Sequence, residues 1–439
     1  MKGKRKRKPF ARLVWDHRRE ERPQPASLAL QGKTFPSAAS PQTDAQLDRL
    51  ILGDNLGVMA SLLSELEGQI DLIYADPPFL TGKAYAARVG RNEDSRRPSE
   101  WQTIAGYQDT WKDGAEYLDM LYPRLRLMYQ LLSPTGTLYL HLDWHASAYA
   151  RVLLDEIFGP NRLLNEIIWA YHGPSPIRSA FKRKHDTILS YTKSSRYTFN
   201  ADAVRVAYDP STIKTFASSR AAGFGKVPDL ERGKVPEDWW YFPVVARLHH
   251  ERTGYPTQKP QALMERIILA SSHQGDLVAD FFCGSGTTAV AASRLGRRWI
   301  ACDATPLAIL TTYRRLLLQP ERKPFSLWQD RAAPFKSTLR PSAAIKISGK
   351  DVTVDLTALR GSSAPHADFP QNLILWEVDW DFDQSQFRSQ SQAVRPFRKN
   401  YIALQQCHTY ATPGQRLIAI RATDSVGKHG LLTEPISIK

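Results

Sequence analysis

The sequence predicts an α/β domain followed by a separate β domain. From Leu47 to about residue 317, short apolar runs alternate with helical patterns, which is typical of an α/β sheet. Between residues 335 and 439, apolar and polar residues alternate with a period of two, and no helical pattern intervenes. The length of 439 residues fits such a division, because domains average about 150 residues.

Each expected strand is a short apolar run, and each expected helix carries an apolar stripe. The strands are expected at residues 50–52, 70–75, 137–142, 166–171, 187–191, 277–281 and 298–302. The helices are expected at 116–132 and 148–158, from Pro260, from Ser285 and after Pro306.

The flanking segments lack this rhythm. Residues 1–45 are rich in Arg, Pro, Ser and Gln, so we expect a basic flexible leader. The main domain then spans 46–330, and within it 192–250 form an irregular insert. Residues 320–334 are expected to be a linker, and 335–439 form the β domain.

The net charge of +15 is concentrated near the N-terminus. Residues 1–25 carry +7 and residues 331–439 carry +5, which leaves +3 on the 305 residues between them. This distribution fits a globular enzyme with a basic arm. The run from Lys4 to Lys8 suits either contact with a nucleic acid or a solvated tail.

The cysteines and the apolar runs indicate a cellular location. Cys283, Cys302 and Cys407 show no paired spacing, which argues against a disulfide framework or a zinc ribbon and suits a reducing cytoplasm. No window approaches the roughly 18 apolar residues of a membrane span. We therefore expect a soluble cytoplasmic protein without a membrane partner.

A glycine-rich turn, Asp-Phe-Phe-Cys-Gly-Ser-Gly, spans Asp280 to Gly286. A strand that ends in such a turn and opens a helix lets the backbone approach a ligand closely. Asp303 lies 17 residues further on, at the end of the next strand, where its carboxylate can accept hydrogen bonds from both hydroxyls of a ribose. A tight turn and a helix-capping Asp would also explain these residues.

The cofactor indicated by this turn is a nucleoside without a pyrophosphate. The chain has no Gly-x-x-x-x-Gly-Lys, and Thr288 or Ala289 stands where a dinucleotide site favours a third glycine. S-adenosylmethionine fits these requirements best.

A second motif, Asp76-Pro77-Pro78-Phe79, follows the apolar run 70–75. The prolines restrict the backbone, so a carbonyl and the Asp76 carboxylate can form a fixed pair of acceptors for an NH2 group. Accepting both hydrogens favours a pyramidal nitrogen whose lone pair can attack a sulfonium methyl. Phe79 offers a face for an extruded base. An Asp that caps a helix beside strand-breaking prolines is the alternative interpretation.

Together these motifs resemble those of the amino-group DNA methyltransferases. Asp-Pro-Pro-Phe is similar to their catalytic motif, and Phe281 to Thr288 is similar to their cofactor motif. Tyr255-Pro-Thr-Gln-Lys-Pro260 resembles the segment that precedes the cofactor motif in that family. The catalytic motif comes first, as in the β class of the family. The resemblance therefore implies a Rossmann-like methyltransferase fold with permuted motif order, and it covers residues 49–317.

The resemblance also implies roles for individual residues. Asp76, Pro77, Pro78 and Phe79 would form the catalytic site. Asp280, Phe281, Gly284 and Gly286 would lie against the cofactor, with Asp303 on its ribose, Asp54 near its adenine, and Thr257 and Lys259 near its methionine. The partner would be DNA, the insert would recognise the target sequence, and no metal is implied.

The function expected from the resemblance is transfer of a methyl group from S-adenosylmethionine to adenine N6 at a specific DNA site. Asp before Pro-Pro favours adenine in this family, with cytosine N4 as the alternative. A catalytically idle DNA-binding protein that retains the fold is the other alternative. A restriction subunit or a second copy of the chain is a further possible partner.

Five other features remain open at this stage. His141 and His145 flank Asp143 and could form a metal pair, although we favour a structural role, and His249-His250 is expected at the surface. The aromatic run 239–242 suits base stacking or anchoring of the insert. The basic cluster at 178–184 suits phosphate contact or a solvated loop. Residues 380–424 resemble PKD or immunoglobulin-like β-sandwich modules.

Overall fold

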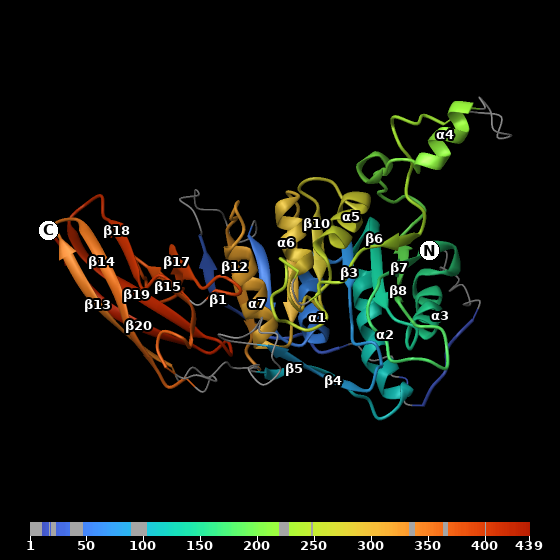
Figure 1. Cartoon of the computed structure of the whole chain (residues 1–439). Coiled ribbons are helices and arrows are strands. Elements are labelled where there is room, and N and C mark those ends of the chain that lie inside the picture. Colours follow the sequence, from blue (N-terminus) through green and yellow to red (C-terminus); the bar gives the residue numbers. More distant parts are fainter. Residues whose placement is uncertain are drawn as a thin grey trace, which may run out of the picture.

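The computed structural model describes residues 11–16, 18, 23–35, 47–88, 103–218, 228–246, 249–332, 339–362, 368–399 and 401–439. The basic run from Lys4 to Lys8 lies outside these residues. Figure 1 shows the α/β domain beside the C-terminal β domain, with helix α4 (Pro210–Ser218) projecting from the α/β part. No helix in these ranges is long and apolar enough to cross a membrane.

The described residues form one large sheet of eleven strands in the order β16-β1-β12-β2-β11-β10-β3-β6-β8-β7-β9. The strands from β12 to β6 in this order are parallel. β8 is antiparallel to β6, and β7 is antiparallel to β8, so β7 again has the direction of the parallel strands. Their bounds are β1 (Leu28–Thr34), β2 (Asp48–Leu52), β3 (Ile70–Ala75), β6 (Leu132–Leu142), β7 (Leu163–Ala170), β8 (His185–Thr192), β9 (Trp239–Tyr241), β10 (Leu277–Asp280), β11 (Arg298–Asp303), β12 (Phe325–Asp330) and β16 (Arg388–Ser389).

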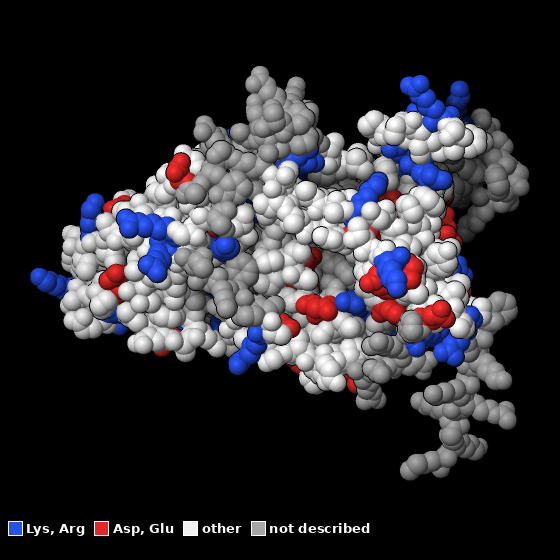
Figure 2. Space-filling model, turned by 90° about the horizontal axis from the view of Figure 1, so that it is seen from below, with Lys and Arg blue, Asp and Glu red and all other residues white. Residues whose placement is uncertain are grey.

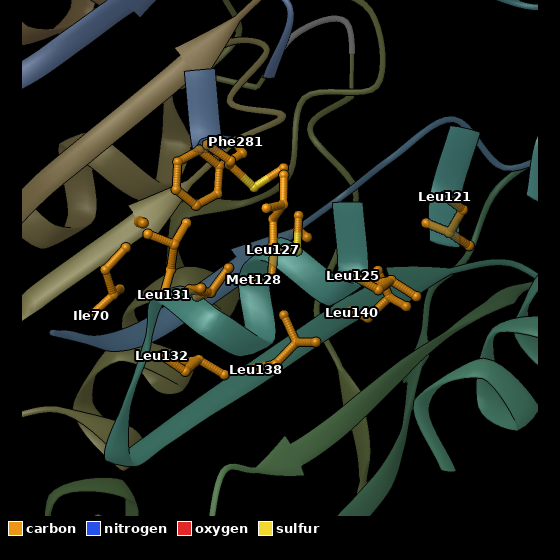
Figure 3. Close-up of a cluster of buried hydrophobic side chains, with 14 of the residues drawn as sticks. Ile70, Leu121, Leu125, Leu127, Met128, Leu131, Leu132, Leu138, Leu140 and Phe281 are labelled. Carbon is orange, nitrogen blue, oxygen red and sulfur yellow. The ribbon is translucent and has the colours of Figure 1, made fainter. Parts of the chain in front are cut away.

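Helices cover both faces of the sheet. Since side chains alternate along a strand, Ile73 of β3 packs toward one layer and Leu72 toward the other. One layer contains α1 (Asn55–Leu66), α2 (Gly114–Leu131) and α3 (Ser147–Phe158), and the other contains α5 (Gln261–Ser271), α6 (Thr287–Arg294) and α7 (Pro306–Leu317). Figure 3 shows Leu125 and Met128 of α2 in the first layer, near Leu138 and Leu140 of β6. The expected α/β architecture is thus confirmed.

Two segments expected to lack regular structure are strands instead. β1 lies within the expected leader, and β12 lies within the expected linker. β12 pairs with β2, and β1 pairs with β12. Their sequences, LALQGKT and FSLWQD, lack the continuous apolar run that marks the central strands. Gly32 in β1 is required for close approach, because a Cβ there would lie 2.8 Å from the Phe387 carbonyl oxygen.

Four further elements lie in the described part of the α/β domain. β4 (Lys83–Arg88) and β5 (Thr103–Asp109) form an antiparallel hairpin that follows the Asp-Pro-Pro-Phe segment. Two short 3-10 helices cover Pro160–Arg162 and Ala201–Val204. The described part of the expected insert is mostly irregular, and β9 joins its aromatic run to the edge of the sheet through β7.

The C-terminal domain is a β-sandwich of two sheets around a shared core. Its strands are β13 (Arg340–Ser348), β14 (Asp351–Arg360), β15 (Leu373–Asp379), β17 (Ser391–Val394), β18 (Gln405–Thr409), β19 (Gly414–Asp424) and β20 (His429–Ile438). The expected β-sandwich is confirmed, but it is less separate than expected. β16 pairs with β1 of the large sheet, and Ile374 and Leu375 join the apolar core beneath α7.

A buried ion pair of the C-terminal domain also accepts a hydrogen bond from the α/β domain. Arg421 donates to Glu377 at 2.8 Å, and the Tyr313 hydroxyl of α7 donates to the same carboxylate. We expect Glu377→Ala to lower the free energy of unfolding by about 3 kcal/mol or more, because Arg421 would remain buried without its partner. Urea denaturation would measure the loss.

The exposed ion pair between Lys346 and Asp355 provides the control. Lys346→Ala should cost less than about 1 kcal/mol, because water screens this pair. Equal and small losses in both variants would contradict a stabilising role for the domain contact.

Candidate active site

A cavity of about 760 Å³ opens at the carboxyl edge of the parallel strands. Asp54 follows β2, Asp76 follows β3, Phe281 follows β10 and Asp303 ends β11, so parallel strands bring them to one edge. The expected site residues that line the cavity are Asp54, Asp76, Pro77, Pro78, Phe79, Thr257, Lys259, Asp280, Phe281, Gly284 and Asp303. Gly286 is absent from this lining.

Asp76 has two carboxylate oxygens in different environments. Oδ2 accepts from the Lys259 ammonium at 2.5 Å. Oδ1 is buried and has no hydrogen-bond partner among the described residues. The Lys259 side chain is held in turn by the Thr257 carbonyl oxygen at 3.4 Å. Asp76 therefore offers one fixed, unused acceptor in the cavity wall.

The segment after Asp76 is held from two sides. The Pro78 carbonyl accepts from the Tyr117 hydroxyl at 2.9 Å. Phe79 stacks on the His141 imidazole with 5.7 Å between ring centroids, and the Lys259 ammonium lies 5.3 Å from its ring centroid. The Phe79 ring is thus held in place by His141 and Lys259.

Asp109, at the end of β5, organises this segment and was missed by the sequence analysis. Its buried carboxylate accepts from the backbone N–H groups of Phe79, Leu80 and Thr81 at 3.1, 2.9 and 2.8 Å. It also accepts from the Thr81 hydroxyl and from the Trp111 indole at 2.6 and 2.8 Å. The sequence around Asp109 does not indicate this role, because the groups that donate to its carboxylate are backbone N–H groups some 30 residues away.

The two glycines of the turn have different surroundings. Gly284 has φ +49°, and a Cβ there would lie 3.2 Å from the Tyr255 ring in the cavity wall. Gly286 has φ +76°, and a Cβ there would lie 2.4 Å from the Thr312 hydroxyl of α7. Gly286 therefore permits close packing of α6 on α7, and the expected contact between Gly286 and a cofactor stays a prediction.

The acidic residues of the turn are largely engaged within the protein. Asp303 accepts from the Gly284 N–H at 3.0 Å and from the backbone and hydroxyl of Thr305 at 2.9 and 2.8 Å. Asp280 accepts from the Thr288 hydroxyl at 2.6 Å and from the Phe282 N–H at 3.0 Å. Burial raises the pKa of Asp303, and it raises the pKa of Asp280 to about 7. Both carboxylates shape the turn as well as line the cavity.

Asp54 is the most exposed of these carboxylates. It caps α1 by accepting from the Leu56 N–H at 3.1 Å, and it accepts from Arg124 at 2.7 Å. Asn55 beside it donates to the Phe281 carbonyl at 2.7 Å, which ties the start of α1 to the glycine turn.

Cys283 of the glycine turn is assigned no chemical role. In agreement with this, burial raises the pKa of its thiol well above its usual value.

The two histidines considered as a metal pair have separate partners. His141 is buried between the Tyr74 hydroxyl at 2.7 Å and Asp186 at 3.2 Å. His145 contacts Asp143 at 2.7 Å. Burial alone would raise the pKa of Asp186, but the hydrogen bond and charge of His141 hold it below its usual value. His249 and His250 stack on each other, and His250 is exposed, as expected.

The chain matches the DNA methylase family N6_N4_Mtase over residues 70–312. Over 271 residues it is 30% identical to the DNA adenine methyltransferase YhdJ of Escherichia coli (strain K12). The aligned region covers 61% of this chain and 82% of that relative. It is 29% identical over 258 residues to the type II methyltransferase M2.DpnII of Streptococcus pneumoniae, covering 57% and 84%. The solved M1.HpyAVI–SAM complex is 19% identical, with a TM-score of 0.40, and covers 61% of this chain and 98% of that one. The chain therefore belongs to the N6_N4_Mtase family of DNA methylases.

Proposed function

We propose that this protein transfers a methyl group from S-adenosylmethionine to adenine N6 at a specific sequence in DNA. The observation that carries the proposal is the unused, buried Oδ1 of Asp76 in the wall of a cavity large enough for a cofactor and a base. The family match and the relative named as an adenine methyltransferase support it.

In the proposed mechanism, the protein orients the N6 amino group and accepts hydrogen bonds from its two N–H groups. Bound S-adenosylmethionine supplies an electrophilic methyl group. Asp76 Oδ1 and a proline carbonyl would accept hydrogen bonds from the two N6–H groups, which leaves the nitrogen lone pair free to attack the methyl carbon. As the N–C bond forms and the methyl–sulfur bond breaks, the neutral thioether would leave and one N6 proton would pass to Asp76 Oδ1. Lys259 fixes the Asp76 carboxylate, and Phe79 stacks on the extruded base.

We propose that the cofactor lies along the glycine turn. Phe281 and Gly284 would contact it through the cavity wall, and Asp303 would reach its ribose with the lone pairs that Gly284 and Thr305 leave free. Asp54 would lie near the adenine, and Thr257 and Lys259 near the methionine. Asp280 would act by fixing the turn.

The remaining assignments are also proposals. The 192–250 insert, with its exposed Trp239 and Tyr241, would read the target sequence. The C-terminal sandwich would be a PKD-like module, since Trp380 stacks on His408 and the Tyr410 hydroxyl donates to the Trp380 carbonyl. DNA as substrate favours the cytoplasm, and a restriction subunit or a second copy would be an additional partner.

Expression in a host without DNA methylation would test the function. Mass spectrometry of the hydrolysed DNA should show N6-methyladenine, and sequencing of the methylated positions should give one recognition site. N4-methylcytosine would show that cytosine is the substrate. If neither base appears while the pure protein still binds S-adenosylmethionine, the chain is an idle member of the family.

The hydrogen bonds between Asp109 and the backbone of residues 79–81, here called the Asp109 clamp, lead to a separate prediction. Asp109→Asn replaces one acceptor oxygen by a donor, so at least one backbone N–H among residues 79–81 loses its partner. We expect kcat for DNA methylation to fall about 10- to 100-fold, with the cofactor Kd unchanged. Steady-state kinetics and titration calorimetry would measure these effects.

Asp113→Asn is the matched control. Asp113 caps α2 a few residues further on, and Asn can cap a helix equally well. This variant should keep the wild-type kcat. Equal rates in both variants would show that the clamp does not position the catalytic segment.

A further inference from the structure

We propose that the loop of residues 171–184 engages the DNA duplex, with Phe181 entering the base stack at the gap left by the extruded base. The inference rests on the proposed methyl transfer to DNA. An enzyme that extrudes a base leaves an unstacked space in the duplex, and an apolar side chain can fill such a space.

The loop rises from the rim of the cavity. β8 is antiparallel to both β6 and β7, so β7 has the direction of the parallel strands. β7 therefore ends, and β8 begins, at the carboxyl edge of the sheet. Tyr171 and Asp186, at the two ends of the loop, both line the cavity. The Tyr171 N–H donates to the Lys184 carbonyl at 3.0 Å, which closes the base of the loop.

A second contact ties the loop to the cavity mouth. The Arg183 guanidinium lies 4.1 Å from the centroid of the Trp144 ring. Trp144 stands between Asp143 and His145, and both of these line the cavity. The basic end of the loop is therefore held beside the entrance through which a base would pass.

The charge of the loop suits a phosphate backbone. Arg178, Lys182, Arg183 and Lys184 lie within it, and residues 171–185 contain no Asp or Glu. Figure 2 shows one face of the molecule, on which Lys and Arg stand in separate groups with Asp and Glu between them. A purely basic loop at the cavity rim can thus hold a duplex in place.

Phe181 is the apolar residue of this basic loop that most needs an explanation. Its side chain is 99% exposed, whereas the other large apolar side chains reported as exposed reach at most 80%. An isolated exposed Phe among four cations gains nothing from water but can stack between bases. The charge around it favours a polyanion over an apolar protein surface as its partner.

The test compares methyl transfer by the full-length wild type and Phe181→Ala on a duplex containing the methylated sequence. We expect kcat/KM to fall about 10- to 100-fold in the variant, as for loss of one base-stacking contact. Phe181→Leu should recover most of the rate, because Leu can also act as a wedge. The deficit of Phe181→Ala should shrink when the target adenine is mispaired, since a mispaired base costs less to extrude.

The controls separate this inference from the proposed function. Tyr401→Ala removes another exposed aromatic side chain, in the C-terminal domain, and should keep the wild-type rate. If the wild type transfers no methyl group, the proposed function is overturned. If the wild type transfers methyl groups, equal rates for Phe181→Ala and the wild type would overturn the insertion of Phe181 (the wedge) but not the proposed function. An equal deficit of Phe181→Ala on paired and mispaired DNA would do the same. A change in oligomeric state with unchanged DNA kinetics would assign Phe181 to a contact between copies, and would also overturn the wedge.

Discussion

Replacing Asp76 by alanine is expected to lower the rate of DNA methylation by about 1,000-fold or more. The variant loses the buried acceptor proposed to hold the target amine and to free its lone pair. The Kd for S-adenosylmethionine should change less than about threefold, because Asp76 is proposed to contact the target amine and not the cofactor. Single-turnover methyl transfer and titration calorimetry would measure the two quantities.

The control must account for Lys259, which pairs with Asp76 and is nearly buried. Asp76→Asn keeps the side-chain volume, so it should fold as the wild type does. Its single acceptor oxygen cannot serve both Lys259 and the target amine, so the variant should still lose most activity. Thermal unfolding of both variants would reveal any loss of structure. Activity of Asp76→Ala within about tenfold of wild type would remove Asp76 from the mechanism.

The parts of the fold that the sequence predicted well are those buried on both faces. β3 was expected at 70–75 and occurs there, because its apolar run faces helices on both sides. β1 and β12 extend the same sheet with mixed sequences, so their pairing depends on neighbours that are distant in the chain. Gly32 shows this dependence, since its role appears only when Phe387 of the C-terminal domain lies against it.

The site was predictable where a motif ends a strand. Asp76 and Gly284 were found this way, and they line the same cavity. Gly286 belongs to the same motif, but its surroundings are set by Thr312 on α7, which the motif does not contain. Asp109 lies on a hairpin that the periodicity did not indicate, and its importance comes from the backbone donors that it gathers.

Replacing Gly284 by valine is expected to raise the Kd for S-adenosylmethionine by about 100-fold or more. The residue has φ +49°, which a β-branched side chain rarely adopts. A Cβ would lie 3.2 Å from Tyr255, so the turn would have to move, and the N–H that holds Asp303 would move with it. The added methyl groups would also occupy the cavity wall proposed to contact the cofactor. Titration calorimetry would measure the Kd.

Gly349→Val separates backbone strain from loss of the site. Gly349 has φ +62° in the turn between β13 and β14, and a Cβ there meets no atom within 4 Å. Valine should cost similar backbone strain at both positions, about 1–3 kcal/mol. Only Gly284→Val should weaken cofactor binding, because only Gly284 lines the cavity. If the two variants bound S-adenosylmethionine equally well at equal loss of stability, the glycine turn would have no direct contact with the cofactor.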